Sequence, residues 1–124
     1  MNSLPRWTEL LVHPIDGISW RIARDITIWT LDRAIWTIPM NTVVTFASSY
    51  ILRWNLLSKK ATFSIASVLH DYLYATGKVT RAMADEYFRD ILIAEGVSKF
   101  MAWKAYLGVR AFGWWAWNSY RKGK

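Results

Sequence analysis

A histidine and an aspartate lie fifteen residues apart, on either side of a glycine, in the second half of the chain. His70 begins the run His-Asp-Tyr-Leu-Tyr, and Asp85 lies within Ala-Asp-Glu-Tyr-Phe. Gly77, between them, is typical of the residue at which a helix ends. At about 1.5 Å of rise per residue, each side chain lies roughly 11 Å from that turn. We therefore expect the two residues at one level of two antiparallel helices.

A histidine that faces a carboxylate is the pair that a water-activating site needs. The carboxylate fixes the tautomer of the ring, and the other ring nitrogen can then take a proton from water. The same pair also occurs where two helices simply pack together, because buried polar groups are nearly always hydrogen-bonded. The spacing leaves both a catalytic pair and a structural pair open.

The residues around this pair predict three helices. The first covers 62–75 and the second 80–95, so these two form an antiparallel hairpin. Gly96 ends the second helix, and Ser98 can cap a third one that runs from 99 towards 120. The pair is therefore positioned by the hairpin.

The first half of the chain predicts strands. Residues 18–23 alternate apolar with polar or small side chains, the pattern of a half-buried strand. Residues 26–31 are rich in β-branched and aromatic side chains, and a turn at Asp32 leads into a further strand over 34–38. Pro39 closes that strand. We predict a three-stranded antiparallel meander that precedes the three helices.

At 124 residues the chain has the length of one domain. We predict an α+β fold, with the meander and a loop in 1–60 and the helical part in 61–124. The uncharged stretch 34–52 holds a proline, an asparagine and several hydroxyl residues that interrupt its apolar run, so we predict a strand and a buried loop there and no membrane span. The absence of cysteine excludes disulfides and thiolate metal sites and fits folding in a reducing cytoplasm.

The end of the chain is basic and rich in tryptophan. The residues after 95 include six bases and no acid, so they carry most of the net charge of +7 of the chain. This favours an anionic neighbour, such as lipid headgroups or an acidic protein surface, although a solvated helix face has the same composition. Nucleic acid is less favoured, because no recognised binding module is present. The candidate partner or membrane surface consists of Lys104, Arg110, Trp114, Trp115, Trp117, Arg121 and Lys122.

The order of short motifs resembles that of a family of small phage and prophage proteins, domain-of-unknown-function family 1353. Its members have a strand meander, a proline-led T-D-x-A-S segment, an H-D-x-L-Y helix, R-x-x-A-D-x-x-F and an A-V-R-x-F-G run. The matching residues here are Pro39, 45–48, 70–74, Arg81 with Ala84, Asp85 and Phe88, and 108–113. The chain reads Val-Thr-Phe at 44–46, where the family has an aspartate. The resemblance implies a phage source and no particular activity.

A second, local resemblance is to calcium-dependent secretory phospholipases and to the phospholipase domains of parvovirus capsids, which share H-D-x-x-Y on one helix and A-D-x-x-F on the next. It implies that His70 is the base, Asp71 a calcium ligand, Asp85 the carboxylate that orients the base, and Tyr74 its support. Calcium would polarise the ester carbonyl. The glycine-rich calcium loop of those enzymes has no counterpart in 54–63, which contain no glycine.

These observations lead us to expect a phage-encoded virion component, at the tail, connector or capsid, that contacts other virion proteins and needs no cofactor. Such a component would be made in the host cytoplasm and would not be an enzyme. The alternative is a small phospholipase-like ester hydrolase, which would use calcium and the His–Asp pair at an anionic membrane surface. A lysis or membrane-associated accessory protein is the third possibility.

Overall fold

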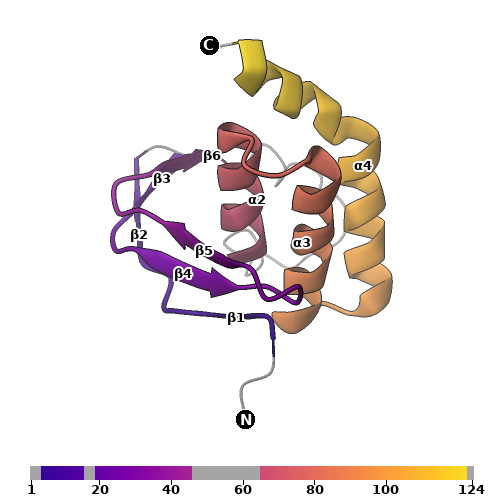
Figure 1. The fold of residues 1–124 in the computed structure, drawn as a ribbon, viewed down its shortest axis with the longest axis horizontal. Coiled ribbons are helices and arrows are strands. Elements are labelled where there is room, and N and C mark those ends of the chain that lie inside the picture. Colours follow the sequence, from indigo (N-terminus) through magenta and orange to yellow (C-terminus); the bar gives the residue numbers. More distant parts are fainter. Residues whose placement is uncertain (1–3, 16–18, 46–64, 123–124) are drawn as a thin grey trace.

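A computed structural model of the protein describes residues 4–15, 19–45 and 65–122. Within these ranges six strands precede three helices (Figure 1). The strands are β1 (Arg6–Trp7), β2 (Val12–Pro14), β3 (Ser19–Ile22), β4 (Ile26–Trp29), β5 (Ile35–Ile38) and β6 (Val43–Thr45). The helices are α2 (Ile65–Thr76), α3 (Arg81–Ala94) and α4 (Lys99–Lys122). The predicted α+β fold, with strands before helices, is confirmed.

The strands form two antiparallel sheets of three strands each. One has the order β1-β4-β5 and the other β2-β3-β6. All three predicted strands are present, and β4 and β5 pair as a hairpin as expected. The prediction of one meander is wrong in its pairing, because β3 lies in the other sheet. The backbone of Ile22 bonds to Asn41 and Thr42, at 2.8 Å in each direction, so the later strand β6 lies along the edge that β4 would have used.

Strand β6 also corrects the prediction of a loop after Pro39. Residues Val43–Thr45 pair with β3, and Val44 is fully buried. The β-branched side chains of this short run suit a strand. Residues 46–52 of the predicted loop, like the start predicted for the first helix at 62–64, lie outside the described residues.

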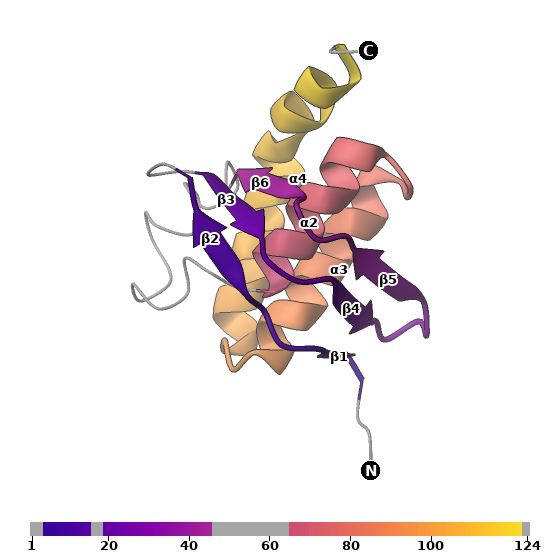
Figure 2. The ribbon, with the colours of Figure 1, turned by 90° about the vertical axis from the view of Figure 1, so that its left-hand side faces the viewer.

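The sheets lie on one side of the helices, and α2 lies between the sheets and the other helices (Figures 1 and 2). Every residue of α2 from Ile65 to Tyr74 is buried. Ile22 of β3, Ile26 and Ile28 of β4 and Ile38 of β5 are fully buried in the same core as residues of α2 and α3. No helix within the described residues is long and apolar enough to span a membrane.

The helix ends are at the expected residues. Gly77 and Gly96 have φ of 66° and 103°, the left-handed conformation that ends a helix. Thr80 caps α3 through Met83 N–H, and the hydroxyl of Ser98 accepts the N–H of Met101 at 3.2 Å in α4. These caps confirm the predicted hairpin of α2 and α3 and the predicted start of α4.

The N-terminus of α2 has an additional partner from far along the chain. Glu95, just after α3, accepts the N–H groups of Ile65 and Ala66 at 3.0 and 3.1 Å. Burial raises the pKa of Glu95 above its usual value, and these two hydrogen bonds oppose that shift. The contact joins the end of α3 to the start of α2, so the hairpin is tied at both of its ends.

Candidate functional site

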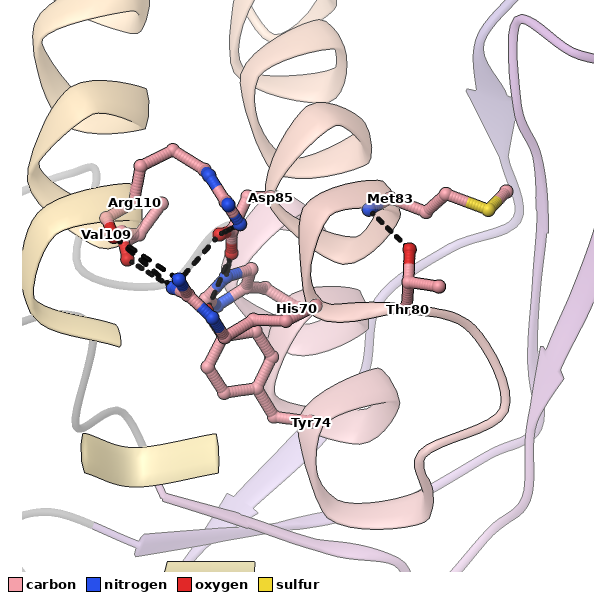
Figure 3. A network of polar contacts seen from close by, with 8 residues as sticks. His70, Tyr74, Thr80, Met83, Asp85, Val109 and Arg110 are labelled. Atoms are coloured by element: carbon pink, nitrogen blue, oxygen red, sulfur yellow. Dashed lines mark hydrogen bonds and ion pairs between the residues drawn. The ribbon is translucent and has the colours of Figure 1, made fainter. Parts of the chain in front are cut away.

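Asp85 of α3 lies at the centre of a polar cluster between the three helices (Figure 3). Its side chain is fully buried. One carboxylate oxygen, Oδ1, lies 2.7 Å from Nε2 of His70 and accepts the hydroxyl of Tyr74 at 2.6 Å. His70 and Tyr74 are one turn apart on α2 and therefore share a face of that helix. The predicted approach of His70 and Asp85 at one level of the hairpin is confirmed.

The other oxygen of Asp85, Oδ2, faces two arginines. Arg110 of α4 donates to it at 2.9 Å, and Arg81, one turn earlier on α3, lies 3.5 Å away. Arg81 also donates to the backbone carbonyls of Val109 and Arg110 at 3.1 and 3.3 Å. One carboxylate thus connects α2, α3 and α4.

Tight packing surrounds these polar contacts. The ring of His70 lies between those of Tyr74 and Phe88, with centroids 4.2 and 4.7 Å away. Gly113 of α4 passes so close to the Tyr74 hydroxyl that a Cβ at this position would overlap it. Trp117 packs edge-on against the same Tyr74 ring at 5.2 Å. The motif residues of α2, α3 and α4 therefore meet in one place.

The charges of the cluster are fixed by these contacts. Burial by itself raises the pKa of Asp85, but the hydrogen bonds from His70 and Tyr74 outweigh it and hold the pKa below its usual value. Burial lowers the pKa of His70 below 6.5, although Asp85 opposes this shift. Burial and then the bond to Asp85 raise the pKa of Tyr74, so it stays a phenol and a donor. At neutral pH the cluster holds an aspartate, a neutral imidazole and two guanidinium ions.

The neutral imidazole has a defined tautomer. Because Asp85 is ionised, Nε2 of His70 carries the proton that it donates, and Nδ1 is left with a free lone pair. This is the protonation state that a general base requires. His70 is only 3% exposed, however, and the two arginines balance the charge of the carboxylate. The arrangement can either orient a base or tie three helices together.

The predicted calcium ligand lies apart from this cluster. Asp71 is buried, and its Oδ1 accepts the hydroxyl of Tyr120 from α4 at 2.8 Å. No group of three or more His, Cys, Asp or Glu side chains that could hold a metal occurs in the described parts of the chain. The role of Asp71 in binding calcium stays a prediction.

The predicted partner surface divides between the two sides of α4. Lys104, Trp114, Trp115 and Lys122 are exposed. The remaining members of that surface, Arg110, Trp117 and Arg121, are partly buried and contact other helices.

Arg121 has a clear internal role. Its Nη2 donates to the backbone carbonyls of Tyr74 and Ala75, the latter at 3.0 Å, and its guanidinium lies over the ring of Trp117 at 4.4 Å. A guanidinium at these carbonyls satisfies groups that the end of α2 leaves open and suits the negative end of its dipole. The lack of a side chain at Gly77 provides the space, since a Cβ there would lie 2.8 Å from Nη1 of Arg121.

The sequence reasoning missed two groups of residues. It did not assign Arg81 and Gly113 to the site, although both belong to short motifs that the sequence analysis had singled out. It also left out four exposed apolar residues of α4, namely Phe100, Trp103, Leu107 and Phe112. The 3.6-residue period of the helix, counted from the small residues Ala102, Ala105 and Val109, would have separated the first three of these from the inner face, whereas Phe112 continues the spacing of the inner residues.

Comparison with known proteins gives one match. A sequence model of the family described as protein of unknown function (DUF1353) matches residues 20–109, from β3 to the residue before Arg110. No curated protein and no solved structure gives a match. Because the match covers more than half of the chain, and includes His70 and Asp85, the protein belongs to the DUF1353 family of proteins of unknown function.

Proposed function

We propose that the protein is a phage-encoded virion component, a tail, connector or capsid accessory protein, that acts through protein–protein contacts. The observation that supports this most is the outer side of α4. Five large apolar side chains there are between 47 and 74% exposed. These residues, which we call the outer ridge, are Phe100, Trp103, Leu107, Trp114 and Trp115. Contiguous apolar patches of more than a few hundred Å² are rare on soluble monomers and mark interaction sites.

The buried cluster around Asp85 supports the same proposal in a different way. Its two arginines and one carboxylate hold α4 against α2 and α3, and this fixes the direction in which the outer ridge points. Buried ion pairs are weak evidence for stability, but they specify one arrangement when every partner is satisfied. A protein that works by docking needs such a rigid face.

Location in purified particles tests the proposal. Particles from the phage or prophage that encodes the chain should contain it in fixed proportion to other virion proteins, as measured by quantitative mass spectrometry. Leu107→Glu should lower that proportion at least tenfold. Leu31→Glu is the matched control, because Leu31 is similarly exposed but lies in the β4–β5 turn. Protein found only in the cytoplasm of producing cells would contradict the virion role.

A phospholipase-like hydrolase is the second candidate, favoured by one observation. His70 donates through Nε2 to Asp85, which also accepts the Tyr74 hydroxyl, so Nδ1 is left for a proton from water. Release of fatty acid from phospholipid vesicles at millimolar calcium tests this. The hydrolase requires activity that His70→Gln abolishes at an unchanged melting temperature. The virion proposal expects no hydrolysis from the wild type.

A further inference from the structure

The outer side of α4 repeats with a period of its own. Six of the exposed residues of α4 follow one another at alternating steps of four and three residues, which is the 3.5-residue spacing of a coiled-coil seam. This outer seam consists of Phe100, Lys104, Leu107, Ala111, Trp114 and Asn118, all of them exposed. At 100° per residue the seam lies opposite the buried residues Ala102, Ala105 and Val109. Within the described residues, no hydrogen bond, ion pair or ring contact joins the seam to another element.

We propose that the outer seam binds a second copy of the protein, with the two α4 helices antiparallel across a twofold axis near Val109. This inference deepens the proposed function, since it names the partner of the outer ridge. A twofold contact is the commonest way in which identical chains associate, and it requires one surface that complements itself.

The seam meets that requirement when the helices are antiparallel. Leu107 then lies opposite Ala111 of the second copy, so a large side chain faces a small one. Lys104 lies opposite Trp114 of the second copy, where an ammonium group can rest on an indole ring. Each pairing occurs twice, once on either side of the axis. The large residues therefore meet small or cationic partners and not one another.

The charges of α4 also favour the antiparallel arrangement. The helix carries no acid, and a parallel pair would set Lys104 directly against its own copy. Antiparallel helices centred on Val109 separate the two Lys104 side chains by about 15 Å along the axis. That distance exceeds the Debye length of about 8 Å at physiological salt, so the repulsion is screened. Arg110, near the axis, is already paired with Asp85 of its own chain.

The available area suits a dimer. An aromatic side chain buries about 150–250 Å² when it is covered completely, so the exposed parts of the outer ridge offer on the order of 500 Å² of apolar surface. Lys104, Ala111 and Asn118 add to it. A standard stable interface buries about 800 Å² on each partner. An exposed ridge that runs along a 24-residue helix can supply this.

Sedimentation velocity of the full chain is the first test. The wild type should be a dimer at tens of micromolar protein. Leu107→Glu should weaken dimerisation at least a hundredfold, because it places a carboxylate in the apolar centre of the seam, opposite Ala111 of the second copy. Leu31→Glu, the matched control, should leave the dimer unchanged. A wild type that stays monomeric at about 100 µM would overturn the inference.

Cross-linking tests the direction of the helices, and the natural chain helps because it has no cysteine. Leu107→Cys carrying one affinity tag is mixed with Ala111→Cys carrying another, and a short bismaleimide is added. The antiparallel seam predicts that the mixed pair cross-links faster than either variant with itself. Faster linkage of each variant to itself would indicate parallel helices and overturn the arrangement. Each variant is first shown by sedimentation to dimerise as the wild type does.

The proposed virion role and the proposed dimer can be overturned independently of each other. Monomeric protein that is nevertheless present in particles would overturn the dimer and leave the virion role standing, whereas dimeric protein absent from particles would do the reverse. Binding to vesicles with anionic headgroups tests the remaining alternative, in which the seam contacts a membrane. If the wild type is a monomer that binds these vesicles, and Lys104→Glu or Leu107→Glu abolishes binding, the seam serves a membrane and the dimer is wrong.

Discussion

The two faces of α4 reverse the usual pattern of a surface helix. The residues that its inner face buries completely are two alanines and a valine, Ala102, Ala105 and Val109, whereas Trp117 and Tyr120 are partly buried against the core. Its outer face exposes the largest side chains, among them Trp114 and Trp115 at 52 and 74%. A helix that packs on a globular protein normally buries its large apolar residues and exposes polar ones. The large exposed residues of α4 are thus not explained by packing in the core of one chain.

The difference between the two faces indicates how α4 is attached to α2 and α3. Small inner residues bring its backbone close to α2 and α3, and they bury little apolar area. Polar contacts at defined positions supply the attachment instead. Arg110 reaches Asp85, and Tyr120 donates to Asp71 at 2.8 Å. We infer that the inner face carries stability and the outer face carries binding, and substitutions on each face can test that division.

The largest effect is expected at the polar centre of the inner face. Asp85→Asn removes the charge that two guanidinium groups share, so the free energy of unfolding should fall by about 3–5 kcal/mol. Urea unfolding followed by circular dichroism measures this. Asp90→Asn is the control, because Asp90 is partly exposed and pairs with its neighbour Arg89 at 3.1 Å, where a loss below about 1 kcal/mol is expected. Equal losses in the two variants would break the division.

A smaller loss is expected where α4 comes closest to α2. Gly113→Ala should lower stability by about 1–3 kcal/mol, because the new Cβ overlaps the Tyr74 hydroxyl. In an isolated helix the same change would raise stability by up to about 1 kcal/mol. Tyr74→Phe removes the overlapping oxygen, so Gly113→Ala should cost much less in that background. A double-mutant cycle measures the coupling, and additive effects would show that the contact is unimportant.

The sequence predicted the helices well, because their signals are local. Gly77 and Gly96 have the left-handed φ that their positions suggest, and the cap at Ser98 is confirmed. The pairing of β3 was missed, since alternation of side chains identifies a strand but does not identify its neighbour. That choice depends on Asn41 and Thr42, which return to Ile22 from far along the chain.

The site was predicted in part for the same reason. Residues on two helices joined by a short turn have levels that follow from the rise per residue, so the contact of His70 with Asp85 could be expected. Arg110 and Arg121 come from α4, whose position relative to the hairpin is a tertiary property. Their charge suggested a binding surface, whereas the fold uses them against Asp85 and the end of α2.

The pH dependence of stability sharpens the description of the inner face. The pKa of His70 is lowered by burial in the folded state, so the unfolded chain binds more protons once the pH falls below about 6.5. Stability should therefore decrease from pH 7 towards pH 5, by an amount set by the shift. His70→Gln keeps an N–H donor for Asp85 and removes the titration, so its melting temperature should vary less over this range. An identical decrease in both proteins would assign the loss to other groups.

The smallest effect is expected on the outer face. Trp115→Ala removes the most exposed of the outer aromatic side chains, and at protein concentrations low enough to keep the chain monomeric it should change the free energy of unfolding by no more than about 0.5 kcal/mol. Val109→Ala, on the inner face of the same helix, removes less volume but should cost roughly 1–3 kcal/mol, because Val109 is buried.

Raising the protein concentration should increase the difference between substitutions on the two faces. If the seam binds a second copy, the wild type gains stability by mass action as dimers form, and Trp115→Ala gains less. A loss of several kcal/mol in dilute Trp115→Ala would show that the outer tryptophans stabilise the single chain, and the two faces of α4 would then not differ in kind.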